Sequence, residues 1–146
     1  DAEVREARED LAARGMLPNA VLVVGATGET GQWVCLKLIE KGFNVRLFVR
    51  NLRKAEELWG PDGSCGDIVV GDVRDAAAFA EAAAGCQAVV YCAGSRNIFG
   101  GNSFQQVDFE GVVNCVEAAR ESGTVLKIVL LSSIGASRPA AAPGGA

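Results

Sequence analysis

Three glycines stand three residues apart in the segment AVLVVGATGETGQW, residues 20–33. They follow an apolar run and precede a helical pattern, which is the context that a dinucleotide-binding turn requires. Gly25 permits a tight turn where a side chain would clash. Gly28 lets the backbone approach a pyrophosphate, and Gly31 lets the helix pack closely on the strand. The segment therefore predicts that N–H groups at the helix start bind a phosphate; the alternative is a glycine-rich turn without a ligand.

Basic residues follow the second apolar run, residues 44–49. Arg50 comes directly after this run, and Arg53 and Lys54 stand close by. An acidic residue at this place binds the ribose hydroxyl of NAD, whereas Arg accepts the extra phosphate of NADP. The guanidinium fork also matches phosphate oxygens. We therefore predict NADP(H) as the preferred cofactor, with NAD(H) possible, although Arg53 or Lys54 could instead belong to a solvated helix face.

Side chains for acid–base or metal chemistry are few. The chain has no histidine, so the commonest general base and any Ser-His-Asp triad are excluded. Its single tyrosine, Tyr91, lies within an apolar run that predicts a buried strand. The five cysteines form no CxxC pair and are odd in number, which argues against a disulfide framework or a zinc site. We predict no metal site, a reducing compartment, and cysteines that are mostly buried.

Strand and helix patterns alternate along the chain and would position these residues. The predicted strands are 20–24, 44–49, 67–72, 88–94 and 127–133, and the predicted helices are 28–41, 52–60, 75–85 and 103–123. Apolar strands separated by helices predict an α/β fold with a doubly wound parallel sheet of the Rossmann type. A complete fold of this type usually has six strands, so five predict that its C-terminal part is missing or interrupted.

The length of 146 residues fits one domain with short flanking segments. We predict an N-terminal amphipathic helix and lead-in over 1–19, a dinucleotide-binding domain over 20–134, and a linker rich in Pro, Ala and Gly over 135–146. The formal net charge of −4 offers no attraction to nucleic acid. No apolar run approaches the roughly 20 residues of a membrane helix, so no transmembrane segment is predicted.

The motif GATGETG, residues 25–31, resembles that of the atypical and extended short-chain dehydrogenase/reductase family, including its NmrA-like members. The resemblance covers residues 20 to about 137 and implies that Thr27, Glu29 and Thr30 join the three glycines in binding the cofactor. The segment VDFEGVVNCVEAA, residues 107–119, is similar to a family helix that begins with Asn, although Asp108 stands at that position here.

Two further turns match the family and imply contacts with the adenosine part of the cofactor. The turn GDVRD, residues 71–75, resembles an acidic turn in which Asp72 would bind the adenine amino group and Val73 would pack on the ring. The segment CAG stands where the family has a small turn beside the ribose. The resemblance therefore adds Cys92, Ala93 and Gly94 to the predicted cofactor site.

Catalysis in this family uses a Tyr and a Lys four residues apart, together with a Ser after the fifth strand. Ser133 stands at the serine position, but Ser95 is the residue four after Tyr91, and these 146 residues contain no YxxxK. The chain is therefore predicted to hold no complete active site. Either the dyad lies outside this sequence, or the protein binds a dinucleotide without reducing a substrate, as do many atypical members that serve as sensors, regulators or assembly factors.

The stretches VLVVGATGETG and VRLFVRN resemble a chloroplast branch of the family. In part of that branch, a domain related to a complex I assembly factor interrupts the fold. The resemblance implies a chloroplast location, in the stroma or thylakoid-associated, with the cytoplasm as the alternative. The first hypothesis is an NADP(H)-binding domain of a larger regulatory or assembly protein with protein partners. The alternatives are an NADPH-dependent reductase or epimerase whose dyad lies elsewhere, and an organellar assembly subunit with a vestigial cofactor site.

Overall fold

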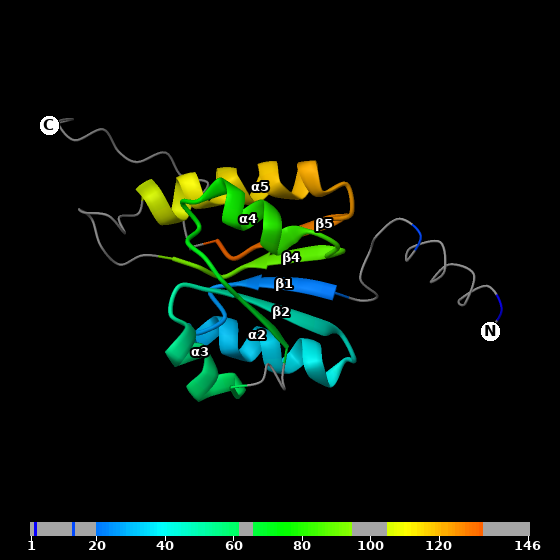
Figure 1. Cartoon of the computed structure of the whole chain (residues 1–146), viewed down its shortest axis with the longest axis vertical. Coiled ribbons are helices and arrows are strands. Elements are labelled where there is room, and N and C mark those ends of the chain that lie inside the picture. Colours follow the sequence, from blue (N-terminus) through cyan, green and yellow to red (C-terminus); the bar gives the residue numbers. More distant parts are fainter. Residues whose placement is uncertain (1, 3–12, 14–19, 62–65, 95–104, 133–146) are drawn as a thin grey trace, which may run out of the picture.

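The computed structural model describes residues 2, 13, 20–61, 66–94 and 105–132. Its strands and helices alternate along the chain (Figure 1). They are β1 (Ala20–Val24), α2 (Glu29–Glu40), β2 (Asn44–Val49), α3 (Leu52–Trp59), β3 (Asp67–Val70), α4 (Ala76–Ala83), β4 (Ala88–Tyr91), the π-helix η1 (Gln105–Glu110), α5 (Gly111–Ser122) and β5 (Lys127–Leu130). The predicted linker over 135–146 and nearly all of the predicted N-terminal segment over 1–19 lie outside the described residues.

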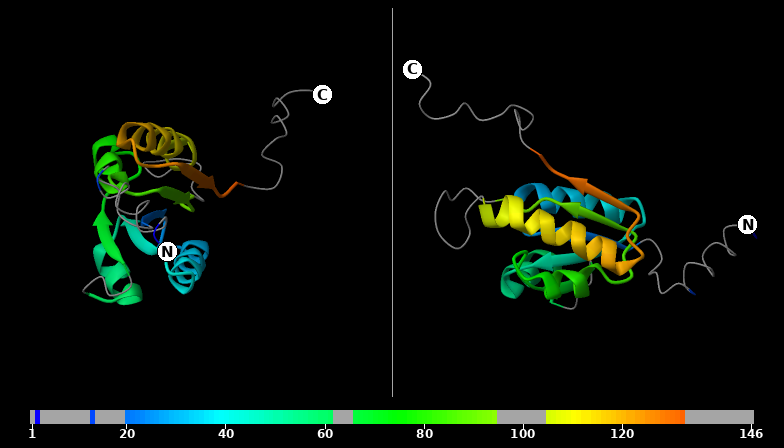
Figure 2. Two further views of the ribbon diagram at one scale, coloured as in Figure 1. Left: turned by 90° about the vertical axis from the view of Figure 1, so that its right-hand side faces the viewer. Right: turned by 90° about the horizontal axis from the view of Figure 1, so that it is seen from above.

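The five strands form one parallel sheet in the order β3-β2-β1-β4-β5. Helices α2 and α3 cover one face of the sheet, and α4 and α5 cover the other (Figure 1); Figure 2 shows these layers from two further sides. The predicted doubly wound parallel sheet is therefore confirmed. The strand order reverses between β1 and β4, and ligands of such sheets bind at the carboxyl ends of the strands beside this point.

A hydrophobic core lies on each face of the sheet. The continuous apolar run of β1 is buried along its whole length because alternate side chains enter opposite cores. Leu22 packs with the aromatic rings of Phe79 and Tyr91 on the side of α4 and α5. Val23 packs with Cys35 on the side of α2 and α3. The sheet is therefore held from both sides, which fixes the carboxyl end of β1 where the glycine turn begins.

Helix ends follow from single residues. Asn51 accepts the N–H of Lys54 at the start of α3, and Asp75 accepts those of Ala77 and Ala78 at the start of α4. Gly123, with φ 65°, ends α5 in the left-handed conformation. The first-turn N–H groups of α3 and α4 are thus capped by a side chain, whereas those of α2 are not.

The predicted helix over 103–123 differs from the structure in its first part. There the chain forms the π-helix η1 before α5 begins at Gly111. The hydroxyl of Tyr91 donates to the carbonyl of Val107, the oxygen that the Gly111 N–H would bind in a regular α-helix. A side chain at Gly111 would collide with the same hydroxyl. Contact with β4 therefore shapes the start of this helix.

Three predicted strands end earlier than expected. β3 stops at Val70, β4 at Tyr91 and β5 at Leu130. Beyond β3 and β4, the chain leaves the sheet and turns into the cleft described below. Within the described part of the chain, no helix is long and apolar enough to cross a membrane.

Candidate functional site

A cleft of about 520 Å³ lies at the carboxyl ends of the strands, beside the point where the strand order reverses. It combines an apolar floor with glycines, two cationic side chains and one carboxylate. The lining residues are Val24, Gly25, Thr27, Gly28, Phe48, Val49, Arg50, Asn51, Lys54, Gly71, Asp72, Val73, Cys92, Ala93, Gly94 and Val107. Of the thirteen residues predicted to bind the cofactor, nine line this cleft; the exceptions are Glu29, Thr30, Gly31 and Arg53.

The glycine turn between β1 and α2 is built by close backbone contacts. Gly25 has φ +83°, and a Cβ there would lie 2.7 Å from the backbone nitrogen of Ala93. A Cβ at Gly31 would collide with the carbonyl of Gly25. Only residues without a side chain therefore allow the turn to lie against both β4 and the first turn of α2.

The start of α2 carries no side-chain cap. Its N-cap residue is Gly28, which is extended (φ −78°, ψ 163°) and has no side chain to accept a hydrogen bond. The N–H groups of Glu29 and Thr30 therefore stand uncapped at the positive end of the helix dipole. The side chains of these two residues are exposed and do not line the cleft, so any part they play there is through the backbone. An uncapped helix start beside a cleft fits a bound anion such as a pyrophosphate.

The carbonyls of the turn are engaged by neighbouring side chains. The buried indole of Trp59 donates to the carbonyl of Ala26 at 3.3 Å. The amide of Gln32 donates to the carbonyl of Thr27 at 3.2 Å. These bonds fix the turn with its acceptors directed toward the protein.

Cationic side chains lie on the β2 side of the cleft. Arg50 lines the cleft as predicted, and Lys54 of α3 lies with it. Arg53 lies elsewhere, because its exposed guanidinium bonds to Glu57 at 3.1 Å on the outer face of α3. Arg53 was the predicted cofactor contact and Lys54 only its neighbour in sequence, whereas in the structure Lys54 lines the cleft and Arg53 does not. Consecutive helix residues point about 100° apart, so only the packing of α3 decides which cation faces the cleft.

Among the described residues that line the cleft, Asp72 alone carries a carboxylate. It accepts the backbone N–H and Nε of Arg74, each at 2.9 Å, and pairs with Nη2 at 2.6 Å. The hydrogen bonds from Arg74 hold the pKa of Asp72 below its usual value, and the charges of Arg74 and Arg50 act in the same direction. The group is therefore an ionised acceptor at neutral pH, suited to an amino or hydroxyl donor. Neighbouring Val73 also lines the cleft, and the amide of Asn114 on α5 donates to its carbonyl at 2.9 Å.

Small residues after β4 form the facing wall, namely Cys92, Ala93 and Gly94. Burial raises the pKa of the Cys92 thiol, so it is neutral at pH 7. Burial also raises the pKa of Cys35 to about 12 and that of Cys115 to about 11. The free thiols of the described residues thus lack thiolate character. No group of three His, Cys, Asp or Glu side chains among these residues could hold a metal ion.

Tyr91, the single tyrosine of the sequence, does not line this cleft. Tyr91 is buried, burial raises the pKa of its hydroxyl, and that hydroxyl bonds to Val107. Tyr91 is therefore part of the core, as its place in an apolar run predicted. Ser133 lies outside the described residues.

Comparison with known proteins identifies the family of the chain. A protein-family model described as NAD(P)H-binding matches residues 25–145. Dihydroflavonol 4-reductase of Zea mays is 32% identical over 123 residues, which cover 79% of this chain and 34% of that protein. A chloroplastic protein of Arabidopsis thaliana, At2g34460, is 39% identical over 78% of this chain and 41% of its own length. The photosystem II assembly factor Ycf39 of Trieres chinensis is 33% identical over 78% of this chain and 34% of its own length.

Solved structures share the fold. A putative NAD-dependent epimerase/dehydratase of Bacillus halodurans superposes with a TM-score of 0.67 at 31% identity, over 80% of this chain and 52% of that one. A short-chain dehydrogenase/reductase superfamily protein of Agrobacterium tumefaciens with bound NAD gives a TM-score of 0.63 at 28% identity, over 78% and 32%. The present chain spans about a third of the length of the curated relatives that it matches.

Proposed function

The chain belongs to the NAD(P)H-binding family within the short-chain dehydrogenase/reductase superfamily, and on this premise we propose that its cleft binds NADP(H) in preference to NAD(H). The observation that carries the preference is the pair of cations, Arg50 and Lys54, on the β2 side of the cleft. In this family of folds, an acidic residue after the second strand would favour NAD. Two cationic side chains there favour the phosphate that distinguishes NADP.

The lining residues fit the parts of a dinucleotide. The uncapped start of α2 at Gly28 would hold the pyrophosphate through backbone N–H groups. Asp72 would accept the adenine amino group, and Val73 would pack on the ring. The small wall after β4 would lie beside the ribose. A bound NADPH would supply a hydride, and the residues named here would hold and orient the dinucleotide.

The direct test is calorimetric titration of the 146-residue chain with NADPH and with NADH. A charge-assisted contact to the extra phosphate is worth about 1.5–3 kcal/mol, so NADPH should bind at least about tenfold more tightly. Equal affinities would remove the case for NADP(H) while leaving a dinucleotide site. Absence of binding by either nucleotide would refute the site itself.

The domain is further proposed to serve a larger regulatory or assembly protein of the chloroplast, in the stroma or at the thylakoid, through contacts with protein partners. One support is the names of relatives, which include chloroplastic proteins and an assembly factor. A second support is the exposure of apolar side chains on β5. Val129 is 47% exposed and Leu130 is 49% exposed, and they lie on opposite faces of the strand. Parallel strands are ordinarily covered on both faces, so this strand offers a surface for further polypeptide.

The described residues that line the cleft include no tyrosine or histidine, and burial raises the pKa of the Cys92 thiol, so the chain is proposed to bind the dinucleotide without a complete active site of its own. The identity to dihydroflavonol 4-reductase favours one alternative, a reductase whose Tyr and Lys lie outside these 146 residues. In that case, Ser133 would orient the substrate oxygen. The two proposals share the cofactor site and differ in where the proton comes from.

A further inference from the structure

The outer edge of β3 is a free strand edge within the described part of the chain. The N–H of Gly71 donates to the carbonyl of Val49 at 2.9 Å. The backbone groups of Gly71, and of every second residue before it in the strand, therefore point toward β2. Since backbone groups alternate in direction along a strand, those of Ile68 and Val70 point away from the sheet. The described sheet places no strand beyond β3. Val70 is 52% exposed. The strand is short and begins with the charged Asp67, but it contains no lysine, proline or bulge, which are other features that commonly block pairing at sheet edges.

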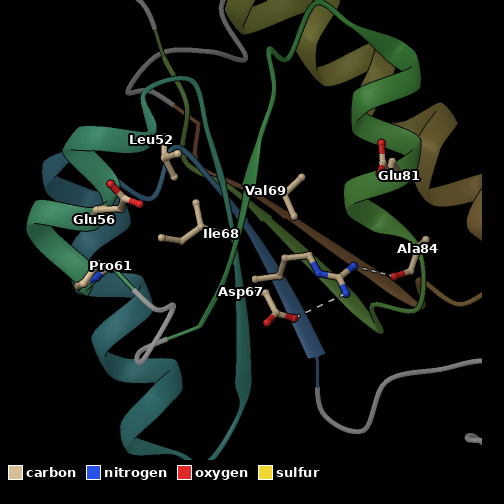
Figure 3. Close-up of a pocket in the computed structure, with 9 residues that line it drawn as sticks. Leu52, Glu56, Pro61, Asp67, Ile68, Val69, Glu81 and Ala84 are labelled. Carbon is tan, nitrogen blue, oxygen red and sulfur yellow. Dashed lines mark hydrogen bonds and ion pairs between the residues drawn. The ribbon is translucent and has the colours of Figure 1, made fainter.

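A hollow of about 680 Å³ lies along this edge and is called the β3 groove here. Figure 3 shows its two walls, with Leu52 and Glu56 of α3 on one side of the strand, and Glu81 of α4 and Ala84 at the end of that helix on the other. Ile68 lies toward the α3 wall, and Val69 toward the α4 wall (Figure 3). The lining of the β3 groove shares no residue with that of the dinucleotide cleft.

The β3 groove is negatively charged. It is lined by the carboxylates of Glu56, Asp67 and Glu81. Among the described lining residues the one cation is Arg46, which donates to the carbonyls of Ala82 and Ala84 at 2.9 and 2.8 Å and lies 3.9 Å from Asp67. In the described lining, three carboxylates against one guanidinium give a net charge of about −2, with one carboxylate on each helix wall and the third, Asp67, on β3.

We propose that the β3 groove binds an extended segment of a partner protein that carries Lys or Arg on both faces. The segment would add a strand to the sheet through the outward backbone groups of Ile68 and Val70. Adjacent residues of a strand point to opposite faces, so two consecutive cations would meet Glu56 and Glu81 separately. A second copy of this chain fits less well, because it would bring the same carboxylates and a net charge of −4.

The test uses the 146-residue chain and a capped synthetic peptide, Thr-Val-Lys-Lys-Val-Thr-Val. Binding is followed by calorimetry, and amide hydrogen exchange is measured residue by residue. We expect saturable binding that weakens with added salt, and exchange at Ile68 and Val70 that slows at least about tenfold in the complex. A peptide with the two lysines replaced by glutamates, and one N-methylated at alternate residues, should not bind.

Variants separate the charge from the strand edge. Glu56→Gln and Glu81→Gln should each weaken binding of the lysine peptide by roughly two- to fivefold, as expected for exposed ion pairs. Glu57→Gln is the matched control, because this residue lies on α3 but pairs with Arg53 outside the groove. Val70→Pro removes one outward N–H and should abolish binding. Titration with NADPH should be unchanged by the glutamine variants, which tests the groove separately from the cofactor cleft.

Three results would overturn the proposal. Equal binding of the lysine and glutamate peptides would show that the groove does not select cations. Unchanged exchange at Ile68 and Val70 in a saturated complex would place the peptide elsewhere. A dimer in sedimentation that Val70→Pro dissociates would show that a second copy, rather than a basic segment, occupies the edge.

Discussion

The indole nitrogen of Trp59 donates to the carbonyl of Ala26 at 3.3 Å. These residues are 33 positions apart, at the end of α3 and within the glycine turn. The bond joins the helix that carries Lys54 to the turn that precedes the uncapped start of α2. The cationic side of the cleft and its proposed pyrophosphate site are thus held in one arrangement.

Trp59→Phe should therefore destabilise the fold. Phenylalanine keeps most of the apolar ring but leaves the Ala26 carbonyl without this donor, which costs about 1–3 kcal/mol when the oxygen is buried. Urea unfolding followed by circular dichroism measures the change. The matched control is Trp33→Phe on α2, where the side chain is 61% exposed and a change within about 0.5 kcal/mol is expected. Equal effects of the two substitutions would show that the bond to Ala26 contributes nothing.

Gly28→Val tests the pyrophosphate site. The backbone of Gly28 is extended, which a β-branched residue adopts readily. A Cβ there would lie 3.3 Å from the carbonyl oxygen of Gly25, and valine is a poorer N-cap residue than glycine, so we expect a modest loss of unfolding free energy with the fold retained. The added side chain would occupy the space in front of the α2 N–H groups, and calorimetry should detect no dinucleotide binding.

Gly31→Ala provides the contrast to this variant. Its Cβ would collide with the carbonyl of Gly25, so the fold itself should be lost or strongly destabilised. If Gly28→Val bound NADPH as tightly as the unmodified chain, the pyrophosphate could not lie at the start of α2.

The sheet was predictable because its strands are continuous apolar runs, and β1 and β2 have the predicted bounds. The ends of β3 and β4 could not be predicted from hydropathy. Asp72 and Cys92 lie outside the sheet because of tertiary packing, which a hydropathy pattern does not show. The π-helix η1 escaped prediction because the hydrogen bond from Tyr91 to Val107 joins residues that no local pattern relates.

Site residues could be predicted where a sequence motif fixes the backbone conformation. They were harder to predict on a helix, where the orientation of the helix decides which side chain faces the cleft. Gly25, Thr27 and Gly28 of the glycine turn line the cleft together with Asp72 and Val73, whereas Glu29, Thr30 and Gly31 do not. Lys54 was missed as a lining residue, because the phase of the short helix α3 depends on its packing through Ala55 and Trp59.

Arg50→Asp should reverse the cofactor preference. It replaces a phosphate-binding cation with a carboxylate that repels the phosphate and can accept the ribose hydroxyl of NAD. NADPH should bind about tenfold to over a hundredfold more weakly, and NADH should change far less. Lys54→Gln should act in the same direction with a smaller effect. Arg53→Gln is the control, since its guanidinium bonds to Glu57; a comparable loss in this variant would show that Arg53 reads the phosphate instead.

Acid should remove the stabilisation that Arg74 gives to Asp72. The folded-state pKa of Asp72 is lower than its ordinary value of 3.8, mainly because Arg74 donates to the carboxylate. The contribution is therefore present above pH 3.8 and is lost as the pH falls through the lower folded value. The gap in unfolding free energy between the unmodified chain and Asp72→Asn should shrink from about pH 5 to pH 2. Arg74→Gln should show the same loss, whereas a gap independent of pH would contradict the assignment.

The 146-residue chain alone should have no carbonyl reductase activity. Hydride transfer to a carbonyl needs a proton donor beside the developing oxyanion. Tyr91 is buried and bonded to Val107, and the raised pKa of Cys92 makes its thiol a poor acid. Ser133 by itself is a hydroxyl with neither a base nor a cation supplied by a YxxxK pair, so it remains a weak acid.

The assay is NADPH oxidation at 340 nm with a series of aldehydes, ketones and quinones, and the expected rate is that of the buffer control. Ser133→Ala and Cys92→Ala are compared with the unmodified chain, with cofactor affinity measured for each. Oxidation that one of these substitutions abolishes, while NADPH still binds, would reveal a proton relay within this chain. The reductase alternative would then replace the proposal of a binding domain, because the hydride and the proton would both be delivered at the same cleft.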